Sequence, residues 1–486
     1  MVNSETDVRT QTGFFGHPRA LGSLFGLEMW ERFSFYGMQA ILTIYLYYAA
    51  TDGGLGLPKT TATSIVGAYG GLVYLSTVVG AWLADRVVGS ERVLLGSAVL
   101  IMFGHVGLAV LPGFAGIGTG LVLVALGSGG LKANATSLVG RLYEQGDDRR
   151  EAGFSLFYLG INLGGFIGPL LTGLAQEELG FHYGFGLAAI GMAVGLVQYL
   201  FGRKNLSPDS NVVPNPLPAA RRSVMAGAAL AGVAVIVALV LLDVITADNL
   251  SIITVVIIVA ASVAYFAVIL ASRQVTTVER RRVASFIPMY LASFVFFALF
   301  QQQFTVVVLY VDERLDRTLF GWEIPVPWAN SINPIFIIVL AGVFAALWTR
   351  LGSRQPTTPV KFAMGTTIMG LAFLAFLPWA GNTGNTTPLL ALVGILFLFT
   401  VAELLLSPVG LSLATKLAPE SFRTQMVALN FLSVALGTAA AGSFARYYDV
   451  DRETPYFLVV GGVAVVFGVL LAIAAPAISK LMSGVR

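Results

Sequence analysis

Ionisable residues interrupt an apolar segment near the start of the chain. Glu28, Glu31 and Arg32 lie in LEMWERFSFYGMQAILTIYLYY, residues 27–48, a run long enough to cross a membrane. Helical spacing places them on one face together with Phe35, Tyr36 and Gln39. Two carboxylates beside one guanidinium leave a site for a proton, and protonation of one acid can free Arg32 to change its partner. The spacing therefore predicts a proton-binding polar stripe along an apolar helix.

Two more ionisable residues, Lys132 and Glu403, lie within other apolar segments. A charge at the centre of a bilayer costs from ~2.5 to well over 10 kcal/mol, so such groups are expected to face a wet cavity or one another. Static ion pairs that fix helix packing are the plain alternative. Exchangeable pairing is favoured, because groups of opposite sign on different helices can change partners when a cavity opens and closes.

The composition predicts the helices that carry these groups. The chain has 486 residues, of which 56% are hydrophobic and 11% charged, and this indicates an integral membrane protein. Apolar runs of about 20 residues occur fourteen times and show no alternation, so all are expected to be helices. They lie near residues 21–50, 60–84, 93–112, 114–140, 152–176, 180–201, 223–242, 251–271, 284–311, 328–348, 360–379, 388–415, 421–446 and 455–479.

The basic residues indicate the orientation of these helices. With both termini in the cytoplasm, only five Lys or Arg residues fall on outer loops: Lys59, Arg314, Arg317, Arg446 and Arg452. This asymmetry favours an orientation in the cell membrane with both termini in the cytoplasm. The net charge of +3 then reflects orientation and contact with membrane lipid, and a nucleic-acid partner has no support.

Two polar linkers divide the chain. A Pro- and Asn-rich stretch at 202–222 and a basic stretch from Ser272 flank two apolar helices. Two six-helix halves around a site at the membrane midplane are a transporter arrangement. The predicted domains are a cytoplasmic tail at 1–20, a six-helix bundle at 21–201, linkers with the inserted helix pair at 202–283, a second bundle at 284–480 and a cytoplasmic tail at 481–486.

Six motifs in order resemble those of the proton-dependent oligopeptide transporter family of the major facilitator superfamily. The first is EMWERFSFYG in the polar stripe. The others are GAWLADRVVGSER from Gly80, GSGGLKANATS from Gly127, FSLFYLGINLGGF from Phe154, NSINPIF from Asn330 and AELLLSPVGLSLATKLAP from Ala402. The inserted helix pair also fits prokaryotic members. The resemblance implies a major facilitator fold with twelve core helices and two inserted ones.

The resemblance also implies a function and a set of site residues. It implies import of di- and tripeptides by proton symport through alternating access. The proton-coupling residues would be Glu28, Glu31, Arg32, Lys132 and Glu403. The substrate-binding residues would be Tyr36, Gln39, Tyr74, Lys132, Asn162, Phe297, Gln301, Asn333, Glu403, Ser407 and Asn430. Taken singly, such polar residues could equally form interhelical hydrogen bonds.

A cytoplasmic loop motif adds a further expectation. Its residues are Gly80, Asp85, Arg86, Gly89 and Arg92. The resemblance implies a latch that stabilises the outward-facing state, in which the Asp pairs with arginines of opposed loops. Ordinary basic loop chemistry on the inner side of a membrane is the alternative.

Several pocket positions depart from the family pattern. Phe35 replaces a second tyrosine, Gln39 an arginine and Gln301 a carboxylate, while Phe297 and Asn430 stand at usual tryptophan positions. These changes put a generic di- and tripeptide specificity in question, because aromatic walls and charge clamps set which ligands fit. The alternative is a transporter of the same fold for another organic solute or peptidomimetic, or one with altered or absent proton coupling.

Other function classes find little support. The sequence has no cysteine, no H-E-x-x-H, no G-x-S-x-G and no P-loop, and only three histidines. We therefore expect no enzyme activity, no metal site, no cofactor and no obligate protein partner. The expected ligands are a small peptide and protons.

Overall fold

Helices that could span a membrane make up most of the protein. The structure, a computed structural model, describes residues 13–144, 147 and 149–485. Within these residues, thirteen helices are long and apolar enough to cross a membrane. Helix α1 (Arg19–Tyr47) adds a fourteenth, because its 29 residues would extend ~43 Å although it carries four charged residues. The predicted all-α membrane fold is therefore confirmed.

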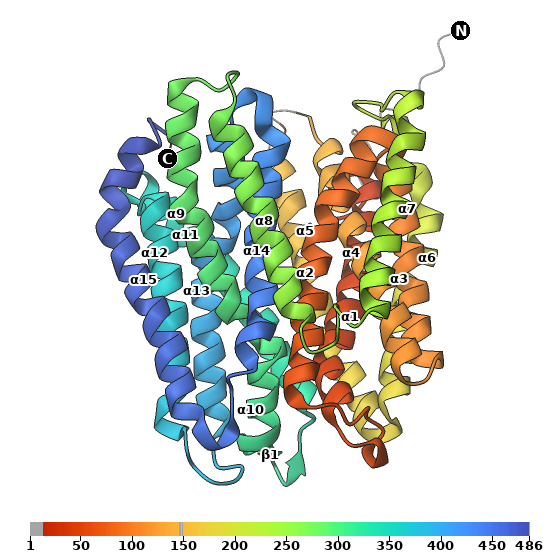
Figure 1. Cartoon of the computed structure of the whole chain (residues 1–486), viewed down its shortest axis with the longest axis vertical. Coiled ribbons are helices and arrows are strands. Elements are labelled where there is room, and N and C mark those ends of the chain that lie inside the picture. Colours follow the sequence, from red (N-terminus) through yellow and green to blue (C-terminus); the bar gives the residue numbers. More distant parts are fainter. Residues whose placement is uncertain (1–12, 145–146, 148, 486) are drawn as a thin grey trace. The chain divides into compact units, whose positions relative to one another are not determined.

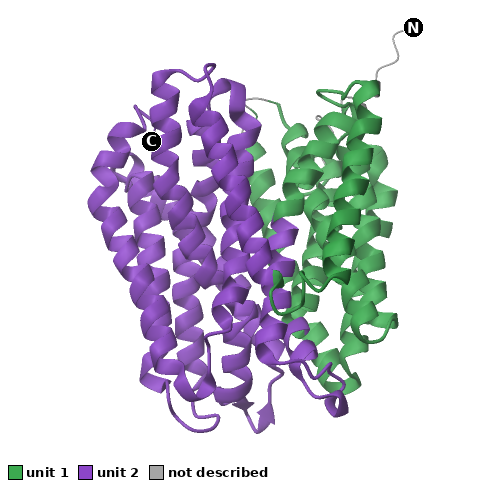
Figure 2. Ribbon diagram, viewed as in Figure 1, with its two compact units in different colours: residues 1–41, 75–250 green, residues 42–74, 251–486 purple. Residues whose placement is uncertain are grey.

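The described helices form two compact units, coloured separately in Figure 2. Unit 1 comprises residues 1–41 and 75–250, and unit 2 comprises residues 42–74 and 251–486. The division cuts α1 after Ile41 and cuts α2 (Lys59–Leu83) after Tyr74. The domain boundaries drawn from the linkers, at 21–201 and 284–480, stay a prediction.

Unit 1 holds most of α1 and the end of α2. Its other helices are α3 (Ser90–Val110), α4 (Gly113–Arg141), α5 (Arg149–Leu179), α6 (Phe181–Gly202) and α7 (Ala219–Leu241), labelled in Figure 1. Glycines allow α5 to approach α1 closely. A Cβ added to Gly164 would lie 2.2 Å from the Met29 carbonyl oxygen, and one on Gly168 would lie 2.4 Å from that of Phe33. This contact fixes the position of the polar stripe of α1.

Unit 2 holds the remaining elements. They are nearly all of α8 (Leu250–Ala271), then α9 (Thr277–Phe300), α10 (Val306–Arg314), α11 (Ile332–Leu351), α12 (Thr358–Leu374), α13 (Leu389–Leu417), α14 (Arg423–Ala445) and α15 (Glu453–Leu481), with the antiparallel strands β1 (Thr318–Leu319) and β2 (Trp322–Glu323). A 3-10 turn at Gln301–Phe304 separates α9 from α10. Together these two helices make one of the membrane spans, Thr277–Arg314.

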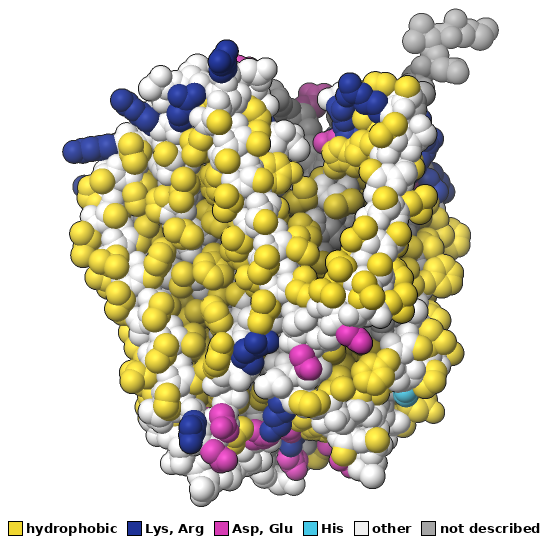
Figure 3. Space-filling model, in the orientation of Figure 1, with side chains coloured by type: hydrophobic (Ala, Val, Ile, Leu, Met, Phe, Trp, Pro, Cys, Tyr) yellow, Lys and Arg dark blue, Asp and Glu magenta, His cyan; other side chains and the backbone are white. Residues whose placement is uncertain are grey.

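Hydrophobic side chains cover the outer faces of the helices in both units (Figure 3). On α15, for example, Val459, Val463, Val466 and Leu470 are all more than half exposed. Such a surface would be unfavourable in water but suits contact with lipid tails. The protein is a multi-pass membrane protein.

Residues 42–74 belong to unit 2 because they pack on α10 and α14. A Cβ added to Gly67 of α2 would lie 2.5 Å from the Cα atom of Gly442 in α14. At the end of α10 the Tyr48 hydroxyl donates to Asp312 at 2.8 Å. Two further contacts, the hydrogen bond of Tyr47 to Asp312 and the ion pair of Lys59 with Glu313, complete what we call the α10 cluster.

A second ion pair at the same end of unit 2 is buried. Arg314 Nε lies 3.1 Å from Glu453 Oε1, which also accepts from the Tyr448 hydroxyl at 2.9 Å. The Gly381 amide donates to the other carboxylate oxygen at 3.1 Å. Burial, helped by the negative charge of Glu453, raises the pKa of Tyr448 well above its ordinary value, so this hydroxyl remains a donor. Both oxygens of Glu453 are therefore satisfied.

We predict that Glu453→Gln destabilises the protein, because it leaves the Arg314 guanidinium buried without its countercharge. The expected loss is ~3 kcal/mol or more. Glu313→Gln is the matched control: its partner Lys59 is 43% exposed, so the expected loss is below ~1 kcal/mol. Thermal unfolding in detergent measures both variants, and equal losses would contradict the assignment of Arg314 and Glu453 as the stabilising pair.

Candidate functional site

The charged residues of α1 are buried together in unit 1. The exposed fractions of Glu28, Glu31 and Arg32 are 3%, 0% and 3%. Arg32 Nε donates to Glu28 Oε1 at 2.8 Å and lies 3.0 Å from Glu31 Oε2. Arg32 therefore donates a hydrogen bond to Glu28 and forms a close ion pair with Glu31, whose Oε2 accepts no hydrogen bond among the described residues.

Helix α4 contributes two residues to the same place. Ser128 Oγ donates to Glu31 Oε1 at 3.0 Å. Lys132 Nζ lies 4.9 Å from the centre of the Phe35 ring, and Arg32 Cζ lies 5.8 Å from that centre. Both cations therefore contact one aromatic ring. We call Glu28, Glu31, Arg32, Ser128 and Lys132 the α1 cluster.

The α1 cluster contains two acids and two bases. Lys132 is attracted electrostatically by Glu31 and Glu28 and repelled by Arg32. Among the described residues, Glu28 Oε2 has no hydrogen-bond donor although it is buried. A buried carboxylate oxygen without a donor is costly when ionised and can be neutralised by a proton. The cluster thus holds two acids against two bases, and its role in proton coupling stays a prediction.

The other predicted residues of unit 1 lie on α1 and α5. The ring of Tyr36 packs edge-on against Phe35, with centroids 5.4 Å apart. Gln39 is buried, and within the described chain its Oε1 accepts no hydrogen bond. The Asn162 amide donates to the Tyr158 carbonyl of its own helix at 2.9 Å. A role of these three residues in substrate binding stays a prediction.

Unit 2 carries a second polar group, at facing positions of α11 and α13. Asn333 Nδ2 donates to Glu403 Oε2 at 3.2 Å and to Thr400 Oγ1 at 3.0 Å. Ser407 follows Glu403 by four residues and so lies one turn further along the same face of α13. We call Asn333, Thr400, Glu403 and Ser407 the α13 cluster.

The remaining predicted residues of unit 2 surround the break after α9. Phe297 packs edge-on against Phe300, with centroids 6.2 Å apart, and Gln301 begins the 3-10 turn with an exposed fraction of 7%. On α14, Asn430 Oδ1 lies 3.1 Å from where a Cβ on Gly410 of α13 would be. Tyr74 is the last residue of unit 2 on α2.

Two predicted pairs have one member in each unit. Lys132 and Gln39 belong to unit 1, and Glu403 and Gln301 belong to unit 2. Contacts of Lys132 with Glu403 and of Gln39 with Gln301 stay predictions.

Two residues of these clusters escaped the sequence analysis. Ser128 precedes Lys132 by four residues, and Thr400 precedes Glu403 by three. Helical spacing therefore put each on the face of a residue that had been identified. Hydroxyl residues at such positions are the signal that could have revealed them.

The cytoplasmic loop motif forms a compact turn in unit 1. A π-helical turn at Ala84–Val88 ends at Gly89, whose φ of +91° favours glycine and whose added Cβ would lie 2.5 Å from the Asn211 carbonyl oxygen. The linker amides of Asn215 and Leu217 donate to the carbonyls of Asp85 and Arg86 at 3.0 and 2.8 Å. The motif thus binds the linker that follows α6, while its role as a latch stays a prediction.

Sequence comparisons agree with the motifs. A family model described as the POT family matches residues 91–456. The chain is 40% identical to an uncharacterized transporter of Bacillus subtilis (strain 168), over 100% of this chain and 99% of that protein. It is 38% identical to a di-/tripeptide transporter of Lactococcus lactis subsp. lactis (strain IL1403), over 98% of this chain and 99% of that protein.

Solved structures give the same result. A crystal structure of the peptide transporter POT in complex with sulfate superposes with a TM-score of 0.93 at 44% identity, covering 98% of each chain. A POT family transporter in complex with 5-aminolevulinic acid superposes with a TM-score of 0.90 at 37% identity, covering 96% of this chain and 98% of the other. The predicted major facilitator fold is thereby confirmed. From its motifs, its fold and these relatives, the chain belongs to the POT family of membrane transporters.

Proposed function

We propose that this protein imports di- and tripeptides with protons by alternating access. The α1 cluster is the observation that carries the proposal, because one guanidinium lies against two buried carboxylates, and a proton on either carboxylate would alter an ion pair. The name of the Lactococcus relative, a di-/tripeptide transporter 38% identical over nearly the whole chain, supports the choice of substrate.

The proposed location is the cell membrane, with both termini in the cytoplasm. On the face shown in Figure 3, the charged side chains of unit 2 are mainly Lys and Arg at the end where Figure 1 places the C-terminus, whereas at the opposite end Asp and Glu lie among Lys and Arg. An excess of Lys and Arg on cytoplasmic loops is the usual pattern, so this distribution supports the proposed orientation.

The proposed mechanism uses one charged residue for each end of the peptide. Proton uptake by Glu28 or Glu31 removes a negative charge beside Arg32 and Lys132, and Lys132 can then attract the carboxylate of the peptide. Glu403, held by Asn333, is the acid that can receive the amino group. Release of peptide and proton on the inner side restores the shared Arg32 contact.

A second candidate is transport of another solute that carries an amine and a carboxylate. The solved transporter in complex with 5-aminolevulinic acid favours this candidate, since that solute has both groups without a peptide bond. The altered residues bear on both kinds of contact: Phe297 and Asn430 stand at usual tryptophan positions, and Gln39 and Gln301 stand at usual charged positions.

Uptake into proteoliposomes under an imposed pH gradient tests the function. We expect accumulation of a labelled dipeptide, and competition by unlabelled di- and tripeptides exceeding that by 5-aminolevulinic acid or free amino acids. The reverse order of competition would favour the second candidate. Uptake that ignores the gradient would refute proton coupling.

We predict that Glu28→Gln and Glu31→Gln each abolish gradient-driven accumulation but keep counterflow exchange. A neutral amide can accept a hydrogen bond from Arg32 but cannot take up the coupled proton. Glu313→Gln, which removes an acid outside the α1 cluster, is the control and should leave accumulation unchanged. Normal accumulation in both α1 variants would remove the α1 cluster from the coupling mechanism.

A second prediction concerns Lys132 and Glu403. Replacing either with Ala should lose transport, and if the two residues pair, each single change leaves a buried charge at a cost of ~3 to 5 kcal/mol. A double-mutant cycle on peptide binding separates pairing from independent roles. Additive effects would argue against direct pairing, whereas a double variant no worse than either single one supports it.

A further inference from the structure

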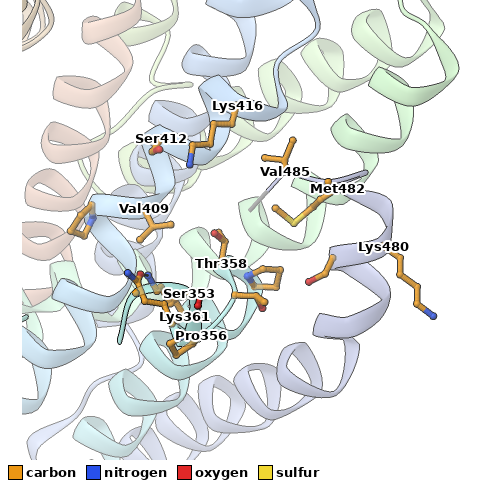
Figure 4. Close-up of a pocket in the computed structure, with 17 residues that line it drawn as sticks. Ser353, Pro356, Thr358, Lys361, Val409, Ser412, Lys416, Lys480, Met482 and Val485 are labelled. Carbon is orange, nitrogen blue, oxygen red and sulfur yellow. Dashed lines mark hydrogen bonds between the residues drawn. The ribbon is translucent and has the colours of Figure 1, made fainter. Parts of the chain in front are cut away.

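A pocket in unit 2 lies away from both polar clusters. It has a volume of about 860 Å³ and is lined by three segments: the loop between α11 and α12 with the first turn of α12, the last three turns of α13, and the end of α15 with the residues that follow it (Figure 4). None of the proposed coupling or substrate-binding residues lines it.

The lining is basic. Lys361 and Lys416 are close enough to repel each other electrostatically, and no Asp or Glu is among the described lining residues. Lys361 is held in place, because its Nζ donates to Gln355 Oε1 at 3.0 Å and lies 4.2 Å from the centre of the Trp348 ring. Two like charges beside one pocket create a positive potential that an anion would relieve.

The start of α12 adds to this potential. Helix α12 begins at Thr358, and the side chain of the preceding Thr357 makes no capping hydrogen bond. Both threonines and Pro359 line the pocket. The positive end of a 17-residue helix therefore lies at the pocket together with the two lysines.

Part of the remaining wall is apolar. Pro356, Pro408, Val409, Met482 and Val485 form this part, and Ser353, Gln355, Ser412, Ser479 and Lys480 add polar groups. Inorganic phosphate would leave this apolar wall in water, whereas a phosphate that carries a glycerol and the start of acyl chains would cover it. The pocket also lies at helix ends, the depth at which lipid headgroups are found.

We infer that this pocket binds the headgroup of an anionic phospholipid. Lys361 and Lys416 pair with the phosphate, the α12 amides and Ser412 donate to its oxygens, and the apolar wall packs on the glycerol. Basic pockets on the cytoplasmic side of membrane helices commonly bind such headgroups. The inference uses the proposed orientation, which puts this end of unit 2 at the inner leaflet, but it is tested without transport.

Binding of a short-chain phosphatidylglycerol to the whole protein in detergent tests the inference, read by thermal shift and native mass spectrometry. Lys361→Gln and Lys416→Gln should each weaken binding about fivefold, and the double variant about 25-fold. Lys480 also lines the pocket, but its side chain extends outward from α15, away from the other two lysines (Figure 4). Lys480→Gln is therefore the matched control, and the affinity of this variant should be unchanged. Because Lys416 is exposed, Lys416→Gln is expected to fold normally. Its lipid affinity therefore tests the inference even if Lys361→Gln folds poorly.

Three results would overturn the inference. Equal binding of the matching phosphatidylcholine, which has no net charge, would show that the net negative charge of the headgroup does not determine binding. Binding of glycerol 3-phosphate or inorganic phosphate as tight as that of the lipid would identify a site for a soluble anion instead. An equal loss in the Lys480 variant would indicate general surface charge. Failed peptide uptake alongside normal lipid binding would count against the proposed function only.

Discussion

Burial of charge inside α1 is the constraint on which unit 1 depends. An ionised carboxylate away from water is tolerated only when charges and donors surround it. Gly164 and Gly168 bring α5 against the backbone of α1, and α4 carries Ser128 and Lys132 to Glu31 and Phe35. Glycines on α5 thus allow close packing against α1, and polar groups on α4 replace the water that the buried charges of α1 lack.

The same physics separates two kinds of buried acid in this protein. Glu453 is fully buried and each of its oxygens has a donor: Arg314 and Tyr448 at one, the Gly381 amide at the other. Glu28 is buried as deeply, yet its Oε2 has no donor among the described residues. The contacts of Glu453 therefore match a static ion pair, whereas the α1 cluster leaves a buried polar atom without a partner among the described residues.

Much of the fold was accessible from local sequence. Apolar runs of about 20 residues identify membrane helices because lipid leaves the backbone no other partners. The grouping of Glu28, Glu31 and Arg32 followed from helical spacing, which needs only one segment. Two hydroxyl residues were missed: Ser128, which donates to Glu31, and Thr400, which accepts from Asn333. Both contacts depend on which helix packs against which. The linkers gave no sign that residues 42–74 pack with unit 2, since that depends on facing small residues such as Gly67 and Gly442.

The amide at Gln301 has a consequence for where charge can act in unit 2. Asp312 and Glu313 follow it by about three turns, and they hold Tyr47, Tyr48 and Lys59 at the end of α10. In the span Thr277–Arg314, Asp312 and Glu313 thus lie near the partly exposed end and not at the buried 3-10 turn that begins at Gln301. Ion pairs at an exposed end exchange their contacts with water more easily. An amide does not titrate, so position 301 takes no part in proton transfer. In the proposed mechanism the coupled proton must then bind in the α1 cluster or at Glu403. Coupling therefore depends more strongly on the contacts of Arg32 with Glu28 and Glu31.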